Sequence, residues 1–566
     1  MLKRLKQRIF RRDSLDMKAE IDPDEIFLDS SNLPEFNIHR FEGTLERPLG
    51  RLTFIVTAAA FLLIGLLFIG RSYALQVKGG EYYRERSENN SLKHTVYFAN
   101  RGLILDRNEN ELAWNELNSE GDFSFRRYIP LSGFSHLLGF VKYPSKDSKG
   151  IYYEENFIPQ SGVEEYYNNI LSGINGIKIT ETNVGGEIQS ESVLNPPKDG
   201  QNIKLSIDVE IQNKLYEYIR GIAGERGFSG GAGVIMDVRN GEILAITSFP
   251  EFNSNLFTSG EDTKAIKNTL NDKNNPFLNR AVSGLYIPGS IIKPFLAIAA
   301  LEENIIDPLK KILSVGQIEI PNPYDKTKKT IFRDWKVHGW VDMRHAISVS
   351  SDEYFYTIGG GYKDQKGLGI DNIEKYMKMF GFGSLTSSPF SEEKEGNVPS
   401  IKWKEENFAG DPWRVGDTYN SSIGQYGFQV TALQVVRAIA AIANDGTLLR
   451  PEILLNSDTQ GSIKIPISYD FIKIIKEGMR LSVLEGTASA LNLPQINVAA
   501  KTGTAELGTT KQAVNSWVTG YFPYENPRYA FAAVMEKCQR SNTVGASYVM
   551  RQLLEWLSIY KPEYIN

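Results

Sequence analysis

Cysteine is almost absent from this sequence. Cys538 is the single cysteine among 566 residues, which excludes an internal disulfide framework and any cysteine-rich zinc site. An excess of either charge is absent too: the net charge is −5, so no electrostatic feature indicates nucleic acid as a partner. With 41% hydrophobic residues, the chain has an ordinary globular composition and is long enough for about two to four domains.

One long hydrophobic run stands out from this background. Residues 52–70, LTFIVTAAAFLLIGLLFIG, carry no charge, and a helix of that length covers about 28 Å, close to the hydrocarbon thickness of a bilayer. A buried core helix is the alternative. A cleaved signal peptide fits less well, because the run follows 51 residues, is long for an h-region and lacks a small-x-small cleavage site. The run is predicted to be a permanent membrane anchor.

The charges on the two sides of this run nearly balance, so they leave its orientation open. Three arginines precede it within about 20 residues and four basic residues follow it. The basic N-terminal stretch MLKRLKQRIFRR favours an internal N-terminus. We therefore expect a single-pass protein of the cell (inner) membrane, with a cytoplasmic tail at residues 1–51 and the part of the chain after the anchor outside.

The rest of the chain divides into two parts that differ in composition and in hydrophobic pattern. Residues 71–205 are polar, with short strand-like pieces between Gly, Asn and Ser turns, which indicates a stalk and a β-rich pedestal module. Residues 206–566 are predicted to form one α+β domain, in which a mainly antiparallel sheet is flanked by helices and holds a helical insert. The expected elements are a helix at 208–225, strands at 231–238, 241–248, 496–506, 515–523 and 528–536, and a helix at 547–560.

A serine and a lysine lie at the start of the apolar segment GLYIPGSIIKPFLAIAALEENII, residues 284–306. If this segment is a helix, Ser290 and Lys293 lie on one face one turn apart. A buried helix would lower the pKa of the lysine and make it a base toward the serine. Pro294 is tolerated in a first turn, and free backbone N–H groups there can stabilise an oxyanion.

The S-x-x-K pair alone is weak evidence for a catalytic site, because such pairs arise by chance and a lysine in the first turn of a helix can simply extend to solvent. Two further motifs strengthen it. SVSSDEYFY contains Ser350 and Asp352, and AAKTGTAE contains residues 501–504 on a predicted strand.

These three motifs, in this order, resemble those of the penicillin-binding proteins. Longer stretches resemble class B members of that family: RGLILDRN at 101–108, SGVEEYYNNILSGINGIK at 161–178, NRAVSGLYIPGSIIKP at 279–294, SIGQYGFQVTALQ at 422–434 and GTA at 486–488. The resemblance covers residues 52 to about 560. It implies a serine β-lactamase-like fold and a monofunctional D,D-transpeptidase of peptidoglycan synthesis that needs no cofactor and no metal.

The resemblance also implies a role for each motif residue. Ser290 attacks the carbonyl between the two terminal D-alanines of a stem peptide and forms an acyl-enzyme, Lys293 takes the serine proton, and Ser350 relays a proton to the leaving amine. An amine from a neighbouring stem then completes the cross-link. β-Lactam antibiotics are the expected covalent inhibitors.

The third motif is implied to bind the substrate. Lys501 with Thr502 fixes the substrate carboxylate, and Gly503 lets the substrate backbone lie against the strand as an added edge. The backbone amides of Ser290 and Thr504 are implied to form the oxyanion hole.

Asp352 departs from the majority motif, in which Asn is common. Similar S-x-D motifs occur in the elongation-specific penicillin-binding protein 2 group, so the resemblance implies cell-wall elongation, with a lipid-II polymerase of the RodA type as partner. A division-specific transpeptidase, a β-lactamase or D,D-carboxypeptidase, and a non-enzymatic β-lactam sensor or scaffold are the alternatives.

Three other patterns compete as sites. GFSGG at 227–231 fits a G-x-S-x-G nucleophile elbow, but a strand rather than a helix is predicted after it, which favours a turn. His338 or His345 would have to reach a serine to complete a Ser-His-Asp site. Asp334 and His338 have metal-ligand spacing but no third ligand of clear spacing, which favours a solvated polar pair.

Overall fold

The computed structural model describes residues 50–84, 92–119, 121–148, 150–182, 188–322, 325, 327–457, 461–508 and 511–565. The chain divides into two compact units, Met1–Ser91 and Leu92–Asn566. In the first unit, helix α1 (Arg51–Tyr73) continues into the π-helical turn η4 (Ala74–Lys78). Its apolar side chains are exposed, and by length and composition it is the one described helix able to cross a membrane. The predicted anchor lies within α1, whereas residues 1–49 of the predicted tail lie outside the described residues.

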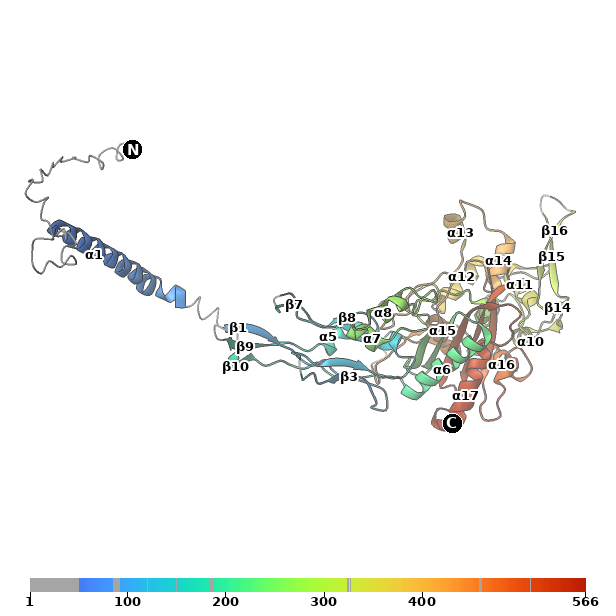
Figure 1. Ribbon diagram of the computed structural model, residues 1–566. Coiled ribbons are helices and arrows are strands. Elements are labelled where there is room, and N and C mark those ends of the chain that lie inside the picture. The colour runs from blue at the N-terminus through green and yellow to red at the C-terminus, as the bar shows by residue number, and fades with distance from the viewer. Residues whose placement is uncertain are drawn as a thin grey trace, which may run out of the picture. The chain divides into compact units, whose positions relative to one another are not determined.

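The second unit begins with small sheets, which fit the β-rich module predicted from the sequence (Figure 1). One sheet has the order β1-β9-β10 and the other β11-β2-β3-β4, with two short pairs, β5-β8 and β6-β7, beside them. The strands are β1 (Leu92–Tyr97), β2 (Ile104–Leu105), β3 (Glu111–Glu116), β4 (Phe125–Tyr128), β5 (Val141–Lys142), β6 (Ser145–Lys146), β7 (Tyr152–Glu154), β8 (Ile158–Pro159), β9 (Gly176–Thr182), β10 (Ile188–Asn195) and β11 (Ile203–Lys204). The short helices are α3 (Ser135–Leu138), α4 (Gly162–Tyr166) and α5 (Asn168–Leu171).

A buried ion cluster joins the strands of this module to α4. Glu164 is fully buried; its carboxylate accepts from Arg101 Nη2 at 2.6 Å and from Arg126 Nε at 2.7 Å, and Tyr128 donates its hydroxyl at 3.3 Å. Burial raises the pKa of Glu164, but the two guanidinium groups outweigh this effect and hold the pKa below its ordinary value. The RGLILDRN and SGVEEYYN stretches of the sequence therefore meet in one contact.

The sheet of the main domain has the order β13-β12-β22-β21-β20 and is antiparallel throughout. Two of its strands come from the beginning of the domain and three from its end, as predicted. They are β12 (Gly230–Asp237), β13 (Ile243–Phe249), β20 (Ala499–Leu507), β21 (Ala513–Phe522) and β22 (Tyr529–Gln539). β20 is an edge strand, so one row of its backbone groups is open to a further strand.

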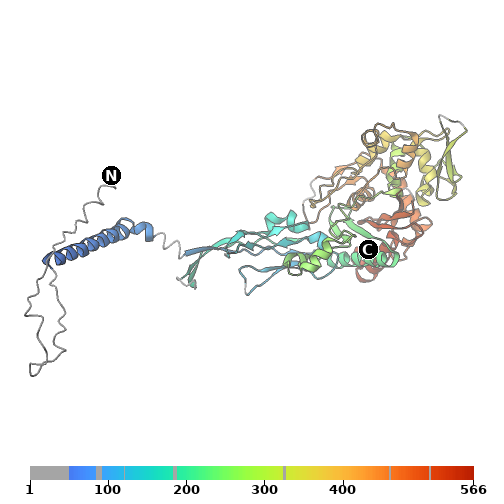
Figure 2. The same ribbon diagram turned by 45° about the horizontal axis from the view of Figure 1, so that its top comes forward.

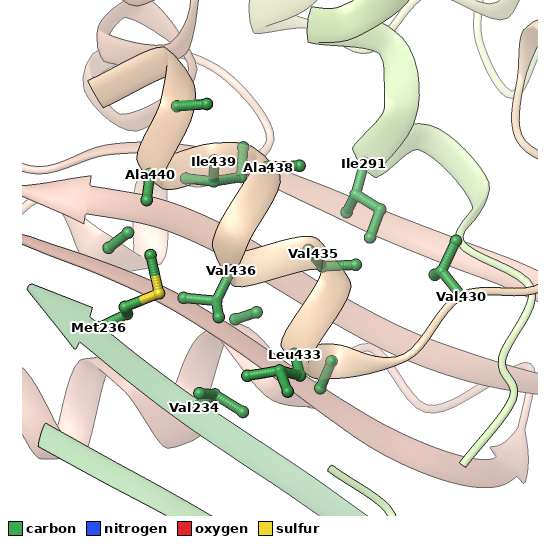
Figure 3. Close-up of a cluster of buried hydrophobic side chains, with 14 of the residues drawn as sticks. Val234, Met236, Ile291, Val430, Leu433, Val435, Val436, Ala438, Ile439 and Ala440 are labelled. Atoms are coloured by element: carbon green, nitrogen blue, oxygen red, sulfur yellow. The ribbon is translucent and has the colours of Figure 1, made fainter. Parts of the chain in front are cut away.

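Helices cover both faces of this sheet. α6 (Val209–Arg226) and α17 (Ala546–Tyr560) pack against each other on one face, where Figures 1 and 2 show the green and red helices side by side. α15 (Ala432–Ala443) packs on the other face, and in Figure 3 its Val436 lies over Val234 and Met236 of β12. Alternate residues of one strand thus enter two different cores, as the period of a strand requires.

The remaining helices form the predicted insert between β13 and β20. They are α7 (Ser254–Ser259), α8 (Thr263–Leu270), η5 (Gly289–Ile292), α9 (Lys293–Glu302), α10 (Met343–Ser348), α11 (Asp352–Gly360), α12 (Ile370–Met379), α13 (Ile401–Asn407), α14 (Val415–Ser422), α16 (Tyr469–Leu484) and η6 (Ser489–Leu491). A last turn, η7 (Pro562–Tyr564), follows α17. Three small antiparallel pairs join the insert: β14 (Ile312–Ser314) with β17 (Gly339–Val341), β15 (Gln317–Pro321) with β16 (Lys329–Arg333), and β18 (Thr447–Leu448) with β19 (Ile463–Lys464).

The GFSGG stretch is a turn, as the sequence favoured. Asp208 caps the start of α6 by accepting from two backbone N–H groups, and Gly227, with φ of 72°, ends the helix in the left-handed conformation. β12 follows at Gly230. A helix therefore precedes the serine and a strand follows it, which is the reverse of a nucleophile elbow.

Candidate active site

Ser290 lies in the 3₁₀ turn η5, immediately before α9 begins at Lys293. The sequence predicted a helix start here, and the structure refines it: residues i and i+3 eclipse one another in a 3₁₀ turn, which brings Ser290 and Lys293 onto one side. Pro294 is in the first turn of α9, as expected. Gly289 has φ of 60° and donates its N–H to the Gly424 carbonyl at 3.0 Å, which anchors the turn to the SIGQYG loop.

Lys293 is completely buried, and its ammonium group is held by the second motif. Nζ donates to the backbone carbonyl of Ser350 at 2.8 Å and to its Oγ at 3.3 Å, and it lies 2.6 Å from Asp352 Oδ1. Among the described residues, Ser290 Oγ has no hydrogen-bond partner. The resting lysine is therefore paired with Asp352, and catalytic contacts of this kind often tighten only when substrate binds.

Ser350 connects the two lysines of the site. It lies between α10 and α11 with φ of 58°, a conformation that a non-glycine residue adopts at an energetic cost. Besides its contact with Lys293, its Oγ accepts from Lys501 Nζ at 2.8 Å. Trp335 Nε1 donates to its carbonyl at 3.2 Å. The strained backbone is thus held from three sides, which points the hydroxyl between two amines.

The third motif lies on the edge strand β20, directly against η5. Lys501 is fully buried and also donates to the Thr502 carbonyl at 2.9 Å. Thr502 is half-buried, with its Oγ1 donating to Thr487 Oγ1 at 2.7 Å, whereas Thr504 is exposed. A ligand can therefore reach the threonine hydroxyls, with the charge of Lys501 behind them.

Gly503 is required by packing inside the protein. A Cβ atom there would meet the Pro288 carbonyl and the Ile291 side chain, each at 2.9 Å. The family resemblance implies that this glycine lets the substrate backbone approach the strand. The structure adds a second reason for it, which is close contact between β20 and the turn that carries Ser290.

Burial sets the electrostatics of the cluster. It lowers the pKa of Lys501 well below its ordinary value, and the nearby charge of Lys293 lowers it further, while Asp352 opposes the shift. Burial also raises the pKa of Asp352, against the attraction of Lys293. Since these groups interact at short range, their protons belong to the cluster rather than to single residues.

Asp334 also contributes to the site, although its spacing from His338 suggested only a metal ligand or, preferably, a solvated polar pair. Its side chain is buried, and its Oδ2 accepts from Ser351 Oγ at 2.8 Å and from the Glu353 backbone N–H at 2.9 Å. It therefore fixes the first turn of α11, in which Asp352 lies. No spacing rule could have found this contact, because it spans 17 residues that include β17 and α10.

The other competing patterns do not form sites. His338 Nε2 lies 3.5 Å from Asp334 Oδ1, and the part of the chain that the structure describes contains no group of three His, Cys, Asp or Glu side chains able to hold a metal ion. His345 contacts Asp342 at 2.9 Å and no serine, among the described residues.

Asp352→Asn is expected to move the acidic limb of the pH profile of acylation to lower pH. The carboxylate raises the pKa of Lys501, whose Nζ donates to the same Ser350 hydroxyl as Lys293, so without it Lys501 loses its proton at lower pH. Stopped-flow acylation by a fluorescent penicillin across pH measures this.

The acylation rates of Asp352→Asn and the wild type should become more similar in acid, because Asp352, whose pKa is raised, is itself neutral there. Asp371→Asn, in the first turn of α12, is the matched control and should leave the profile unchanged. A profile for Asp352→Asn that coincides with the wild type would show that the carboxylate lies outside the titrating cluster.

Known proteins are similar to most of this chain. The family model of the penicillin binding protein transpeptidase domain matches residues 231–555, and that of the penicillin-binding protein dimerisation domain matches residues 122–205. The peptidoglycan D,D-transpeptidase MrdA of Haemophilus influenzae is 30% identical over 470 residues, which are 76% of this chain and 69% of that protein.

Solved structures are similar over most of the chain. The penicillin-binding protein PBP2 of Helicobacter pylori, in its complex with MreC, is 26% identical with a TM-score of 0.69, covering 83% of this chain and 99% of that one. A chain of a peptidoglycan synthase complex that coordinates polymerization and crosslinking is 27% identical with a TM-score of 0.68, covering 89% and 97%.

Proposed function

Because this chain belongs to the class B penicillin-binding proteins, as a peptidoglycan D,D-transpeptidase of the elongation type, we propose that Ser290 is its nucleophile and that Lys293, Ser350, Asp352 and Lys501 complete the catalytic group. The observation that carries this assignment is the Ser350 hydroxyl, which lies 3.3 Å from Lys293 Nζ and 2.8 Å from Lys501 Nζ. Three motifs far apart in the sequence thereby meet beside one serine.

Acylation uses the first two motifs. The Ser290 Oγ attacks the carbonyl carbon of the penultimate D-alanine while its proton passes to Lys293 in its neutral amine form, which requires that the cluster has first given up one proton. The C–N bond then breaks, and the leaving D-alanine amine receives a proton through Ser350. In the second half-reaction an amine of another stem peptide attacks the ester carbonyl, and Ser290 recovers its proton as the cross-link forms.

Substrate binding uses the edge strand β20. The terminal carboxylate is held by the hydroxyls of Thr502 and Thr504, with the positive charge of Lys501 behind them. The substrate backbone pairs with the open edge of β20. The backbone N–H groups of Ser290 and Thr504 receive the developing oxyanion, since η5 and β20 lie against each other at this point.

Membrane placement and partners are a further part of this proposal. We propose a cytoplasmic tail at 1–51, a transmembrane helix at 52–70, a stalk and pedestal at 71–205 and a transpeptidase domain at 206–566, with all but the tail and anchor outside the membrane. Work on a growing cell wall requires a supply of new glycan, so a RodA-type glycosyltransferase is the proposed partner. The complex of a Helicobacter pylori PBP2 with MreC supports assembly with partner proteins in general.

The full-length protein, incubated with lipid-linked glycan carrying pentapeptide stems and a glycan polymerase, is expected to produce cross-linked stem dimers and to release one D-alanine per cross-link. Mass spectrometry of the digested product measures both. A product that contains only shortened, uncross-linked stems would identify a D,D-carboxypeptidase instead, while the Ser290→Ala protein should produce neither product.

A further inference from the structure

A cavity in the helical insert has no part in the chemistry described above. Its volume is about 520 Å³, within the range of roughly 300–1,000 Å³ that is usual for small-ligand pockets. The end of α12, the loop that follows it, α15 and the β18–β19 pair form its walls. Lining residues include Lys378, Leu385, Arg437, Leu448, Arg450 and Ile463. None of its described lining residues belongs to the active site.

Arg437 is the one charged residue of α15, a helix whose twelve residues are all buried. The apolar side chains of this helix fill the core above the sheet (Figure 3). Arg437 itself is 7% exposed. Its Nε donates to the Leu449 carbonyl at 2.7 Å, whereas its Nη1 and Nη2 have no hydrogen-bond acceptor, and no carboxylate within 4.0 Å, among the described residues.

The other charges near the cavity are already paired. Arg450 lies 3.1 Å from Glu452 and Lys378 lies 2.6 Å from Glu374. Glu393 attracts Arg437 through space, but its two carboxylate oxygens accept from a backbone N–H and a hydroxyl of its own loop. No acidic side chain is found among the described residues that line the cavity. Within the described part of the chain, Arg437 is therefore a largely buried cation with open donors.

A buried charge without an opposite charge in contact is destabilising, and burial lowers the pKa of Arg437 from its ordinary value. Guanidinium groups nevertheless stay charged in proteins, and their planar fork matches a carboxylate or a phosphate with two parallel hydrogen bonds. The lining beyond Arg437 includes the apolar side chains of Leu385, Leu448 and Ile463. We propose that this cavity binds a small organic anion, a carboxylate or phosphate on an apolar body, with its anionic group on Nη1 and Nη2 of Arg437.

Saturation-transfer NMR can test the proposal by measuring how benzoate and phenyl phosphate bind to the full-length protein. Neutral benzamide is the control. We expect saturable binding of at least one of the two anions and none of benzamide. A preference between the anions would tell a carboxylate ligand from a phosphate ligand. In Arg437→Gln the affinity should fall by about tenfold or more, because a hydrogen-bonded charge contact is lost.

A second pair of variants keeps the test independent of the folding of Arg437→Gln. Leu385 is 48% exposed at the cavity, so Leu385→Glu supplies an internal carboxylate that competes for Arg437, and Leu385→Gln is its neutral match. We expect Leu385→Glu to abolish anion binding and Leu385→Gln to keep it, with penicillin acylation normal in both. The proposal is overturned if the wild type binds neither anion, if benzamide binds equally well, or if Leu385→Glu binds the anions as the wild type does.

Discussion

Lys293→Met is expected to slow acylation by a β-lactam by about 10²–10⁴-fold, the usual contribution of a positioned general base. Methionine keeps the apolar volume of a fully buried side chain but cannot accept the proton of Ser290. The loss should appear in the rate of acylation rather than in weaker initial binding, since Lys293 contacts Ser350 and Asp352 and not the edge strand that binds substrate. Stopped-flow measurements over a range of penicillin concentrations separate the acylation rate constant from the affinity of initial binding.

The substitution also leaves Asp352 without its cation, which could lower the stability of the fold and confuse the result. The double variant Lys293→Met, Asp352→Asn removes both charges, so it should melt close to the wild type and still fail to acylate. If Lys293→Met loses less than about tenfold in rate, the base is not Lys293. The assignment would then move to Lys501, whose pKa burial lowers and whose Nζ lies 2.8 Å from Ser350 Oγ.

Glu164→Gln is expected to lower the free energy of unfolding by about 3–5 kcal/mol, because it removes the one carboxylate between two buried guanidinium groups. Glu164 and Arg126 have fully buried side chains and that of Arg101 is 1% exposed. Glutamine keeps the shape of the side chain but cannot balance either charge. Urea unfolding followed by circular dichroism measures the change.

Glu165→Gln is the matched control, since Glu165 is the next residue of α4 and is exposed; it should change stability by less than about 0.5 kcal/mol. The pKa of Glu164 is lower in the folded protein than in the unfolded chain. Its contribution to the free energy of unfolding is therefore present above the unfolded pKa and is lost as the pH falls through the folded pKa. The stabilities of Glu164→Gln and the wild type should become equal in strong acid. Equal stability of Glu164→Gln and wild type at neutral pH would contradict a structural role for this cluster.

The local sequence pattern was sufficient to predict the strands of the main sheet and the helices that cover it. The predicted strands at 231–238 and 515–523 correspond to β12 and β21, because β-rich runs between turn residues have few alternatives. The helix at 208–225 corresponds to α6, whose cap Asp208 and terminal Gly227 are readable signals. The apolar run at 52–70 lies within a helix of the length that a bilayer requires.

The fine structure of the site could not be predicted, because it depends on contacts between distant segments. The sequence around Ser290 predicts one continuous helix, whereas the structure has a 3₁₀ turn at 289–292. This turn packs closely against Gly503 and is anchored through Gly289. The left-handed backbone of Ser350 is held by groups of other segments. Likewise, Arg101 and Glu164 are 63 residues apart, and their pairing follows from the fold rather than from any local pattern. The roles of the individual site residues stay predictions.

The most direct measurement of the central claim is the identity of the residue that a labelled penicillin modifies in the full-length protein. Digestion and mass spectrometry should find the label on one peptide and place it on Ser290, and the Ser290→Ala protein, folded as judged by its melting temperature, should carry none. A label on any other residue, or labelling that persists in Ser290→Ala, would contradict the account.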